Sequence, residues 1–245
     1  LEDVANYYKE AYDYTKTLTA EYINAEGKTE TFYKLLGDEN IDVGKVMIDG
    51  KENAVINKLV PGIVGGLFKP NIYGLVPCNN RNPKLDNYNC DEKDPGKKDF
   101  RKSYVKGEDV LDANITDNGD GTITMVIQPK AAEMSMRGED SQGDFFEVLG
   151  DISATVAQID VISFAQGTAE DNIKVTYKGG TVTCTINTKT KEITKAEYDM
   201  VAEVAVNHAN VAVIKDKSAS LLIKYKNTFP ASDKYLKDKK GVVRK

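Results

Sequence analysis

No proline occurs between Pro129 and Pro230, whereas five of the seven prolines lie between Pro61 and Pro95. Because proline lacks a backbone N–H and is excluded from central strands, the proline-free stretch is free to form long, uninterrupted strands. From Asp109 onward, apolar and polar residues alternate with the period of a half-buried β-strand. The proline distribution therefore predicts antiparallel strands after residue 109 and a more irregular arrangement before it.

The alternation also predicts where the strands begin and end. A Gly-containing DNGDG turn between the first two alternating runs indicates a β-hairpin. We expect strands at 111–115, 123–127, 173–177, 182–186, 192–206, 211–214 and 218–225, joined by short turns that include Lys178-Gly179-Gly180 and 187–191. One face of the strand at 192–206 carries Tyr198, Met200, Ala202, Val204 and Val206. Residues 141–159 instead place apolar side chains at helical spacing, which predicts a helix that covers the sheet.

The N-terminal part has two further helical candidates. Apolar residues recur at helical spacing from Leu1 to about Asn24, although the segment YTKTLTAEYI also alternates like a strand. A second helix is expected over about 51–59, and Pro61 should end or kink it. Residues 69–107 are expected to form a long irregular connection.

These patterns predict an α+β fold, a curved antiparallel β-sheet (a meander) covered on one side by helices. We expect residues 1–245 to form a single domain with a helical and irregular N-terminal part at 1–108 and a mainly antiparallel sheet at 109–230. A basic tail follows at 231–245, and its segment DKYLKDKKGVVRK has six basic and two acidic residues. We expect this tail to be solvated and poorly ordered, and the alternative is electrostatic attachment to an anionic envelope surface.

The overall charge excludes some classes of partner. The chain has 33 Lys and Arg against 38 Asp and Glu, a net charge of -5, so it lacks the basic footprint of nucleic-acid-binding proteins. The most apolar stretch, 60–68, is interrupted by proline and glycine and is too short for a membrane span. We therefore expect neither nucleic acid nor a membrane span.

The three cysteines fall into two environments. Cys78 and Cys90 flank a Pro- and Asn-rich segment, where a disulfide would close a loop. Reduced thiols and a metal pair are the alternatives for these two residues. Cys184 alternates with Val182 and Ile186, so we expect it to be a small buried apolar residue on a strand. A Cys78–Cys90 disulfide and the start of the chain at Leu1, which suggests processing, both favour a secreted protein.

Catalytic and metal-binding motifs are lacking. His208 is the one histidine, which excludes a His-rich zinc site, and we expect it at a strand end without a catalytic role. Ser141 lacks the first glycine of a G-x-S-x-G motif. The segment TDNGDGTITM resembles the middle of an EF-hand loop, but Thr116 and Ile127 occupy the positions that require Asp and Glu, so a hairpin turn is favoured. We predict no catalytic residue, no metal site and no cofactor.

Five tyrosines occur close together near the N-terminus. We expect them to pack in the core with their hydroxyls reaching water, and a ligand-lining stripe is the alternative. They are Tyr7, Tyr8, Tyr12, Tyr14 and Tyr22.

The order of several segments resembles that in uncharacterised secreted proteins and lipoproteins of clostridial Gram-positive bacteria. These segments are GLVPC, DNGDGTITMVI, SQGDFFEVLGDI, VTYKGGTVTCTINTKTKEITKAEYDM and DKSASLLIKY, and the similarity covers roughly residues 60–230. The resemblance implies a location outside the membrane, extracellular or attached to the cell envelope, with a lipidated cysteine before Leu1 as a conjectural tether. It implies no activity and no site residues.

Two functions follow from the sequence. We favour an extracytoplasmic, non-catalytic binding or cell-surface protein whose partner is an apolar small molecule on the concave face of the sheet or a component of the cell envelope. The motivation is a strongly apolar strand face in a chain without catalytic motifs. The alternative is a carboxylate-based hydrolase acting on envelope polysaccharide, which requires a cleft with two acidic side chains, one of them with a raised pKa.

Overall fold

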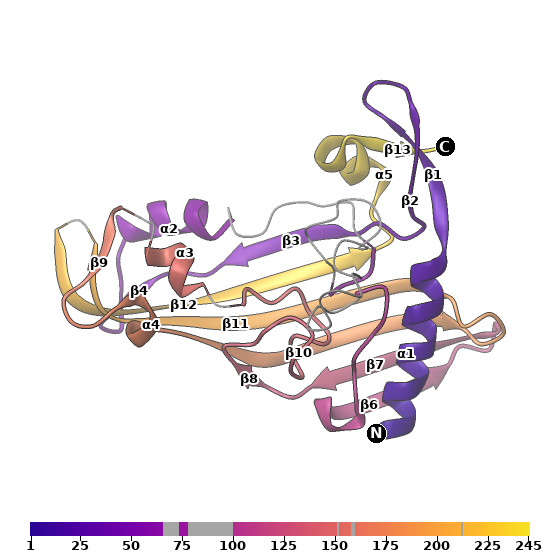
Figure 1. Ribbon diagram of the computed structural model, residues 1–245, viewed down its shortest axis with the longest axis horizontal. Helices are drawn as coiled ribbons and strands as arrows, with labels where there is room; N and C mark the ends of the chain where they lie inside the picture. Colours follow the sequence, from indigo (N-terminus) through magenta and orange to yellow (C-terminus); the bar gives the residue numbers. More distant parts are fainter. Residues whose placement is uncertain (66–73, 78–99, 151, 158–159, 212) are drawn as a thin grey trace, which may run out of the picture.

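The computed structural model describes residues 1–65, 74–77, 100–150, 152–157, 160–211 and 213–245. Three long consecutive strands form the centre of the main sheet (Figure 1). They are β10 (Ile173–Asn187), β11 (Ile193–Val211) and β12 (Ile214–Phe229), and each is antiparallel to the next. Cys78 and Cys90 lie outside the described residues, so their predicted disulfide stays a prediction.

Shorter strands extend the main sheet on both sides of this centre. The hairpin of β6 (Val110–Asp117) and β7 (Thr122–Pro129) continues the sheet beyond β10, as the alternation predicted. Strand β3 (Asp38–Val43) pairs with β12, so the N-terminal part of the chain also contributes to this sheet. The remaining short strands are β4 (Met47–Ile48), β5 (Lys51–Glu52), β8 (Ala132–Glu133) and β9 (Ile162–Phe164).

A second, three-stranded sheet joins the two ends of the chain. Its central strand β1 (Thr19–Asn24) pairs with β2 (Thr29–Tyr33) on one side and with β13 (Val242–Arg244) on the other. Beside it lie α5 (Asp233–Tyr235) and the π-helical turn η2 (Leu236–Lys240). This unit has a core of its own, formed by Tyr22, Phe32, Tyr33, Leu36, Ala231, Leu236 and Val242.

The expectation of a solvated, poorly ordered basic tail was wrong. The side chain of Lys240 is fully buried, and its Nζ lies 2.7 Å from Oε1 of Glu39. The hydroxyl of Tyr235 donates to the other oxygen of that carboxylate at 2.7 Å. Ion pairs to Glu21 and Asp233 engage further basic residues, so much of the positive charge of the tail is neutralised within the fold.

Few residues are helical. The N-terminal helix α1 (Glu2–Thr17) buries Ala5, Tyr8, Ala11, Tyr12 and Thr15 on one face at helical spacing and then gives way to strand β1, as the alternating pattern of this segment allowed. The others are α2 (Ile56–Gly65), the short helices α3 (Ser153–Ala157) and α4 (Ala169–Asn172), and the 3-10 turn η1 (Gly107–Asp109). None of the described helices is long and apolar enough to cross a membrane.

Two helix predictions need correction. The helix expected at 51–59 begins later, at Ile56, because the side chain of Asn53 accepts the N–H groups of Val55 and Ile56 and Lys51–Glu52 forms strand β5. Pro61 was expected to end or kink this helix, and it lies inside the helix, so the expected end is wrong and the expected kink stays a prediction.

The helix expected at 141–159 forms only over Ser153–Ala157. The carboxylate of Asp140 accepts the N–H groups of Met136, Gln142 and Gly143, and it thereby fixes turns in place of a helix. The backbone of Gly143 also passes so close to the carbonyl oxygen of Met136 that a Cβ would lie 1.9 Å from it. Phe145 and Phe146 are nevertheless buried, so the apolar pattern marked core residues without marking a helix.

The turn expected at Lys178-Gly179-Gly180 is a bulge inside one strand. Gly179 and Gly180 adopt φ of 105° and 134°, and the register of β10 against β11 shifts there while the strand continues. The strand expected at 211–214 does not form, since Val211 ends β11 and Ile214 begins β12, and the strand expected at 218–225 lies inside β12. The chain is thus an antiparallel, sheet-rich α+β protein with longer strands than the sequence predicted.

Candidate functional site

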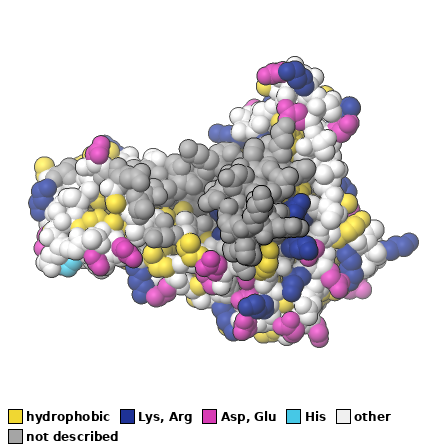
Figure 2. Space-filling view, viewed as in Figure 1, with side chains coloured by type: hydrophobic (Ala, Val, Ile, Leu, Met, Phe, Trp, Pro, Cys, Tyr) yellow, Lys and Arg dark blue, Asp and Glu magenta, His cyan; other side chains and the backbone are white. Residues whose placement is uncertain are grey.

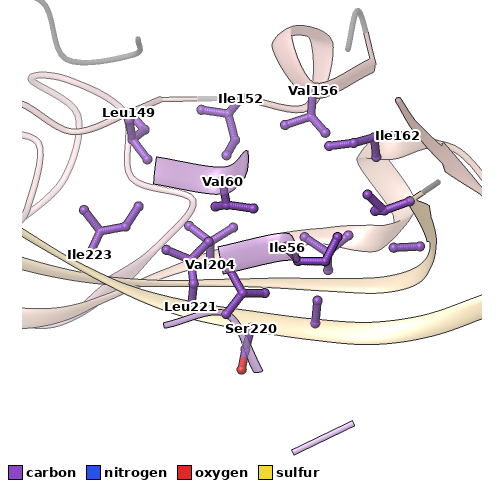
Figure 3. A pocket seen from close by; sticks show the side chains of 15 residues that line it. Ile56, Val60, Leu149, Ile152, Val156, Ile162, Val204, Ser220, Leu221 and Ile223 are labelled. Carbon is purple, nitrogen blue, oxygen red and sulfur yellow. The ribbon is translucent and has the colours of Figure 1, made fainter. Parts of the chain in front are cut away.

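An apolar cavity of about 120 Å³ lies at the end of the main sheet that carries α2, α3 and β9 (Figures 1 and 3). Its floor is the inner face of β11 and β12, and its other walls are α2, α3, β9 and the segment before α3. The lining residues are Val46, Ile56, Val60, Leu149, Ile152, Val156, Ile162, Val204, Val206, Ala209, Val211, Ala219, Ser220, Leu221 and Ile223.

Side-chain size along the long strands explains why the cavity forms at this end. Near α1, the same strands present large side chains to the core, including Tyr198 on β11 and Phe229 on β12. Toward the other end, β11 presents Val204 and Ala209, and β12 presents Ala219. Small and β-branched side chains reach less far from a sheet than aromatic rings, so a space remains between the strands and the helices.

Among the described residues, no side chain offers a polar group to a ligand in the cavity. The described lining residues are apolar except Ser220, whose hydroxyl points away from the other lining side chains (Figure 3). Apolar cavities of about 150 Å³ stay dry and accept small apolar molecules such as benzene, whereas a buried water needs polar partners. The described lining is therefore suited to apolar groups.

The sequence patterns predicted only some of the residues that line the cavity. They placed Val204 and Val206 on one face of a long strand, and both line the cavity. Ile56 falls inside the helix expected at 51–59, whereas Val60 lies just beyond the expected end of that helix. Ile162 was missed because β9 is only three residues long. The lining residues Ala209 and Ala219 were the available signal, since small residues on an inward strand face leave room for a ligand.

Of the five N-terminal tyrosines, Tyr8, Tyr12 and Tyr22 pack in the core away from this cavity, whereas Tyr14 is 40% exposed, contrary to the prediction. The hydroxyls of Tyr8 and Tyr198 are hydrogen-bonded to each other, and that of Tyr12 donates to the carbonyl oxygen of Pro77 at 2.8 Å. Core packing is confirmed for Tyr8, Tyr12 and Tyr22, but their hydroxyls bind protein groups and do not reach water. Burial raises the pKa of both Tyr8 and Tyr198, so neither is available as a general acid or base near neutral pH.

Cys184 is buried beside these tyrosines and forms no disulfide, as expected for a small apolar strand residue. Burial raises the pKa of its thiol to about 12, so the nucleophilic thiolate is not populated at neutral pH.

His208 lies at an irregularity near the end of β11. Its φ is +50°, and the register between β11 and β12 shifts on both sides of Ala209. The ring Nδ1 is 2.8 Å from Oδ1 of Asp216, and both side chains are about half exposed. This is a surface contact that joins two strand ends, in line with the expected place of His208 at a strand end.

The hydrolase alternative requires two acidic side chains, one of them with a raised pKa. Among the described residues, Glu197 and Asp199 are the candidate pair. Burial, and then the neighbouring Glu197, raise the pKa of Asp199, while Lys226 lowers it. The Nζ of Lys226 lies 2.6 Å from Glu197 and 3.7 Å from Asp199. These side chains alternate with the buried ones on β11, so they lie on the outer face of the sheet and do not line the cavity.

The EF-hand-like segment forms the turn of the β6–β7 hairpin, with Asp120 bound to the N–H and hydroxyl of Thr122. No cluster of three His, Cys, Asp or Glu side chains within the described ranges is arranged to hold a metal ion.

Comparisons with known proteins add no relative. No family model, no curated protein and no solved structure matches this chain. The cavity and the surface around it are therefore the basis for a functional proposal.

Proposed function

We propose that the protein binds a small apolar molecule, or the aliphatic part of a larger one, in the cavity between β11, β12 and α2. The observation that supports this proposal is a lined space of about 120 Å³ whose one polar lining residue, Ser220, directs its hydroxyl elsewhere. The role is binding without catalysis, since no nucleophile or proton donor among the described lining residues faces the space.

The energetics favour an occupied cavity. At about 24 cal/mol per Å³, an empty cavity of about 120 Å³ lowers stability by about 3 kcal/mol relative to a filled one. Each methylene that a ligand transfers from water into such a space contributes about 0.8 kcal/mol. A ligand of a few carbon atoms thus gains free energy without any hydrogen bond.

The carboxylate hydrolase remains the alternative, with Glu197 and Asp199 as its candidate pair. The location of this pair favours the binding role, because both carboxylates share Lys226 on an open strand face. We further propose that helices and the segment before α3 cover the ligand-bearing side of a curved sheet, and that the protein works outside the cytoplasm, secreted or attached to the cell envelope.

Benzene is a suitable probe for the cavity. We expect saturating benzene to raise the melting temperature of the wild-type protein in calorimetry, because it binds the native state and not the unfolded chain. Ala209→Leu should fill the cavity and abolish the shift. Ala205→Leu, on the same strand but in the outward-facing register, is the matched control and should retain it.

A wild-type protein that shows no benzene shift, or an Ala209→Leu variant that keeps the full shift, would contradict the proposal. If Ala209→Leu does not fold, Val204→Ala provides a second test, because enlarging the cavity should allow p-xylene to raise the melting temperature by more than it does in the wild type.

A further inference from the structure

The cavity is elongated along the strands. Its lining on β11 runs from Val204 to Val211, and at about 3.3 Å per strand residue this stretch extends over about 20 Å. Figure 3 shows the lining side chains in two facing rows, one from Leu149 to Ile162 and the other on β11 and β12. A space of about 120 Å³ that follows a lining of this length is narrow, so its shape suits a chain better than a compact molecule.

One end of the cavity is deeply buried, and the other lies near the surface at the turn between β11 and β12. Along β12, Ile223 is 1% exposed, whereas Leu221 and Ala219 are half-buried. Along β11, Val204 is buried, whereas Val211, the last residue of the strand, is half-buried. The described lining therefore becomes more exposed with distance from Ile223, which makes the end at the β11–β12 turn the entrance.

The lining is aliphatic throughout. Apart from Ser220, the described lining residues are all Ala, Val, Leu or Ile. Because none of them is aromatic, a flat ring finds no partner for stacking there. The lining therefore favours saturated hydrocarbon.

The entrance is polar and carries charges of both signs. The Nζ of Lys217 lies 2.7 Å from Oδ2 of Asp49, and the ring of His208 contacts Asp216. Figure 2 shows hydrophobic side chains and side chains of both charges together at the end of the molecule that carries β9. A polar group of a ligand can thus remain in water at this end, and the surroundings do not select the sign of its charge.

We propose that the cavity takes up one unbranched alkyl chain, with its methyl end toward Ile223 and a polar group left in water at the β11–β12 turn. This inference rests on the proposed function and narrows the ligand to linear amphiphiles. A carbon group of such a chain needs about the space of a water molecule in the liquid, about 30 Å³, so the cavity encloses about four of them. The carbons of a longer chain remain near the entrance.

Titration of the full chain with alcohols, followed by ligand-observed NMR, tests the inference. From ethanol upward, the affinity for 1-alkanols should rise about fourfold per carbon until about four carbons are enclosed, and then level off. We expect 1-hexanol to bind several-fold more tightly than cyclohexanol. We expect 1,6-hexanediol to bind at least fivefold more weakly than 1-hexanol, because its second hydroxyl is buried among apolar side chains.

A pair of variants tests the direction of insertion. Ile223→Ala enlarges the buried end, so the affinity should level off at a chain longer by up to about three carbons. Val211→Ala, which removes carbons at the entrance, is the matched control and should leave that chain length unchanged. If Ile223→Ala does not fold, Ile223→Val should lengthen the limit by about one carbon.

Equal affinities for 1-hexanol and cyclohexanol, undiminished binding of the diol, or an unchanged chain limit in the Ile223 variants would overturn the inference. Benzene separates it from the proposed function. A benzene shift together with any of these results refutes only the insertion of a linear chain, whereas absence of both the benzene shift and alkanol binding refutes the proposed function as well.

Discussion

The phenol oxygens of Tyr8 and Tyr198 lie 2.9 Å apart in the core, although 190 positions separate the two residues in the sequence. Both side chains are fully buried, and the pair connects α1 to the central strand β11. The contact holds the N-terminal helix against the aromatic half of the sheet, the half opposite the cavity.

This pair predicts a non-additive effect on stability. Tyr198→Phe should lower the free energy of unfolding by about 1–3 kcal/mol, because the hydroxyl of Tyr8 loses its partner in a buried site. Tyr8→Phe should do the same, whereas the double variant should lose less than the sum of the two. Urea unfolding followed by circular dichroism measures all three, and additive losses would show that the two hydroxyls do not depend on each other.

Stability should also fall at alkaline pH. Burial raises the pKa of Cys184 to about 12, against about 8.5 for cysteine in an unfolded chain. The protonated thiol is favoured by the fold, so this contribution is complete below about pH 8.5 and is lost as the pH rises toward 12, by up to about 1.4 kcal/mol per pH unit. Tyr8 and Tyr198, whose pKa values burial also raises, should add to the loss above about pH 10.

The contribution of the thiol can be isolated by comparing Cys184→Ala with the wild type. Unfolding free energies between pH 8 and 10 should decline less steeply in the variant, since the tyrosines still hold their protons there. Parallel curves would mean that Cys184 is not the group responsible.

The β-bulge in β10 predicts unequal tolerance of its two glycines. A Cβ at Gly180 would lie 2.2 Å from the carbonyl oxygen of Asp199, whereas at Gly179 the nearest atom would be 3.7 Å away. Both glycines have positive φ, so Gly179→Ala should cost about 1–3 kcal/mol from backbone strain alone. Gly180→Ala should cost clearly more, and equal thermal stabilities of the two variants would argue against this backbone approach.

The buried ion pair of the tail predicts local release of the C-terminal segment. Lys240→Met removes the ammonium group that pairs with the buried carboxylate of Glu39, a change that typically costs about 3–5 kcal/mol. We expect trypsin to cleave this variant within 233–245 much faster than the wild type. Lys239→Met, at the exposed neighbouring position, serves as the control, and equal cleavage of both variants would show that the pair does not hold the tail.

The sequence predicted the elements whose stability is local. Alternation located the β6–β7 hairpin, and the inward face of β11 from Tyr198 to Val204 was identified correctly. Elements that depend on distant partners were missed. Strand β3 exists because β12 pairs with it, and the segment around Phe145 forms turns because one carboxylate, that of Asp140, captures several N–H groups.

Only one wall of the candidate site, the inward face of β11, could be predicted from the sequence. Periodicity indicated that Val204 and Val206 point inward, but an unfilled space depends on what lies opposite, and the opposing residues Ile56 and Ile162 come from elements far away in the sequence. The spacing of apolar residues along one strand does not show how far away the opposing side chains lie.

The pairing of residues 22–24 with 242–244 sets an order of events during synthesis. As the chain leaves the ribosome, β1 and β2 can form their hairpin early, but the other edge of β1 stays open until the last strand has emerged. Strand β3 likewise cannot pair with β12 until β12 has been synthesised. Each newly made molecule therefore exposes unpaired strand edges for most of its translation, the period in which such edges recruit other chains, and a holding chaperone would shorten that exposure.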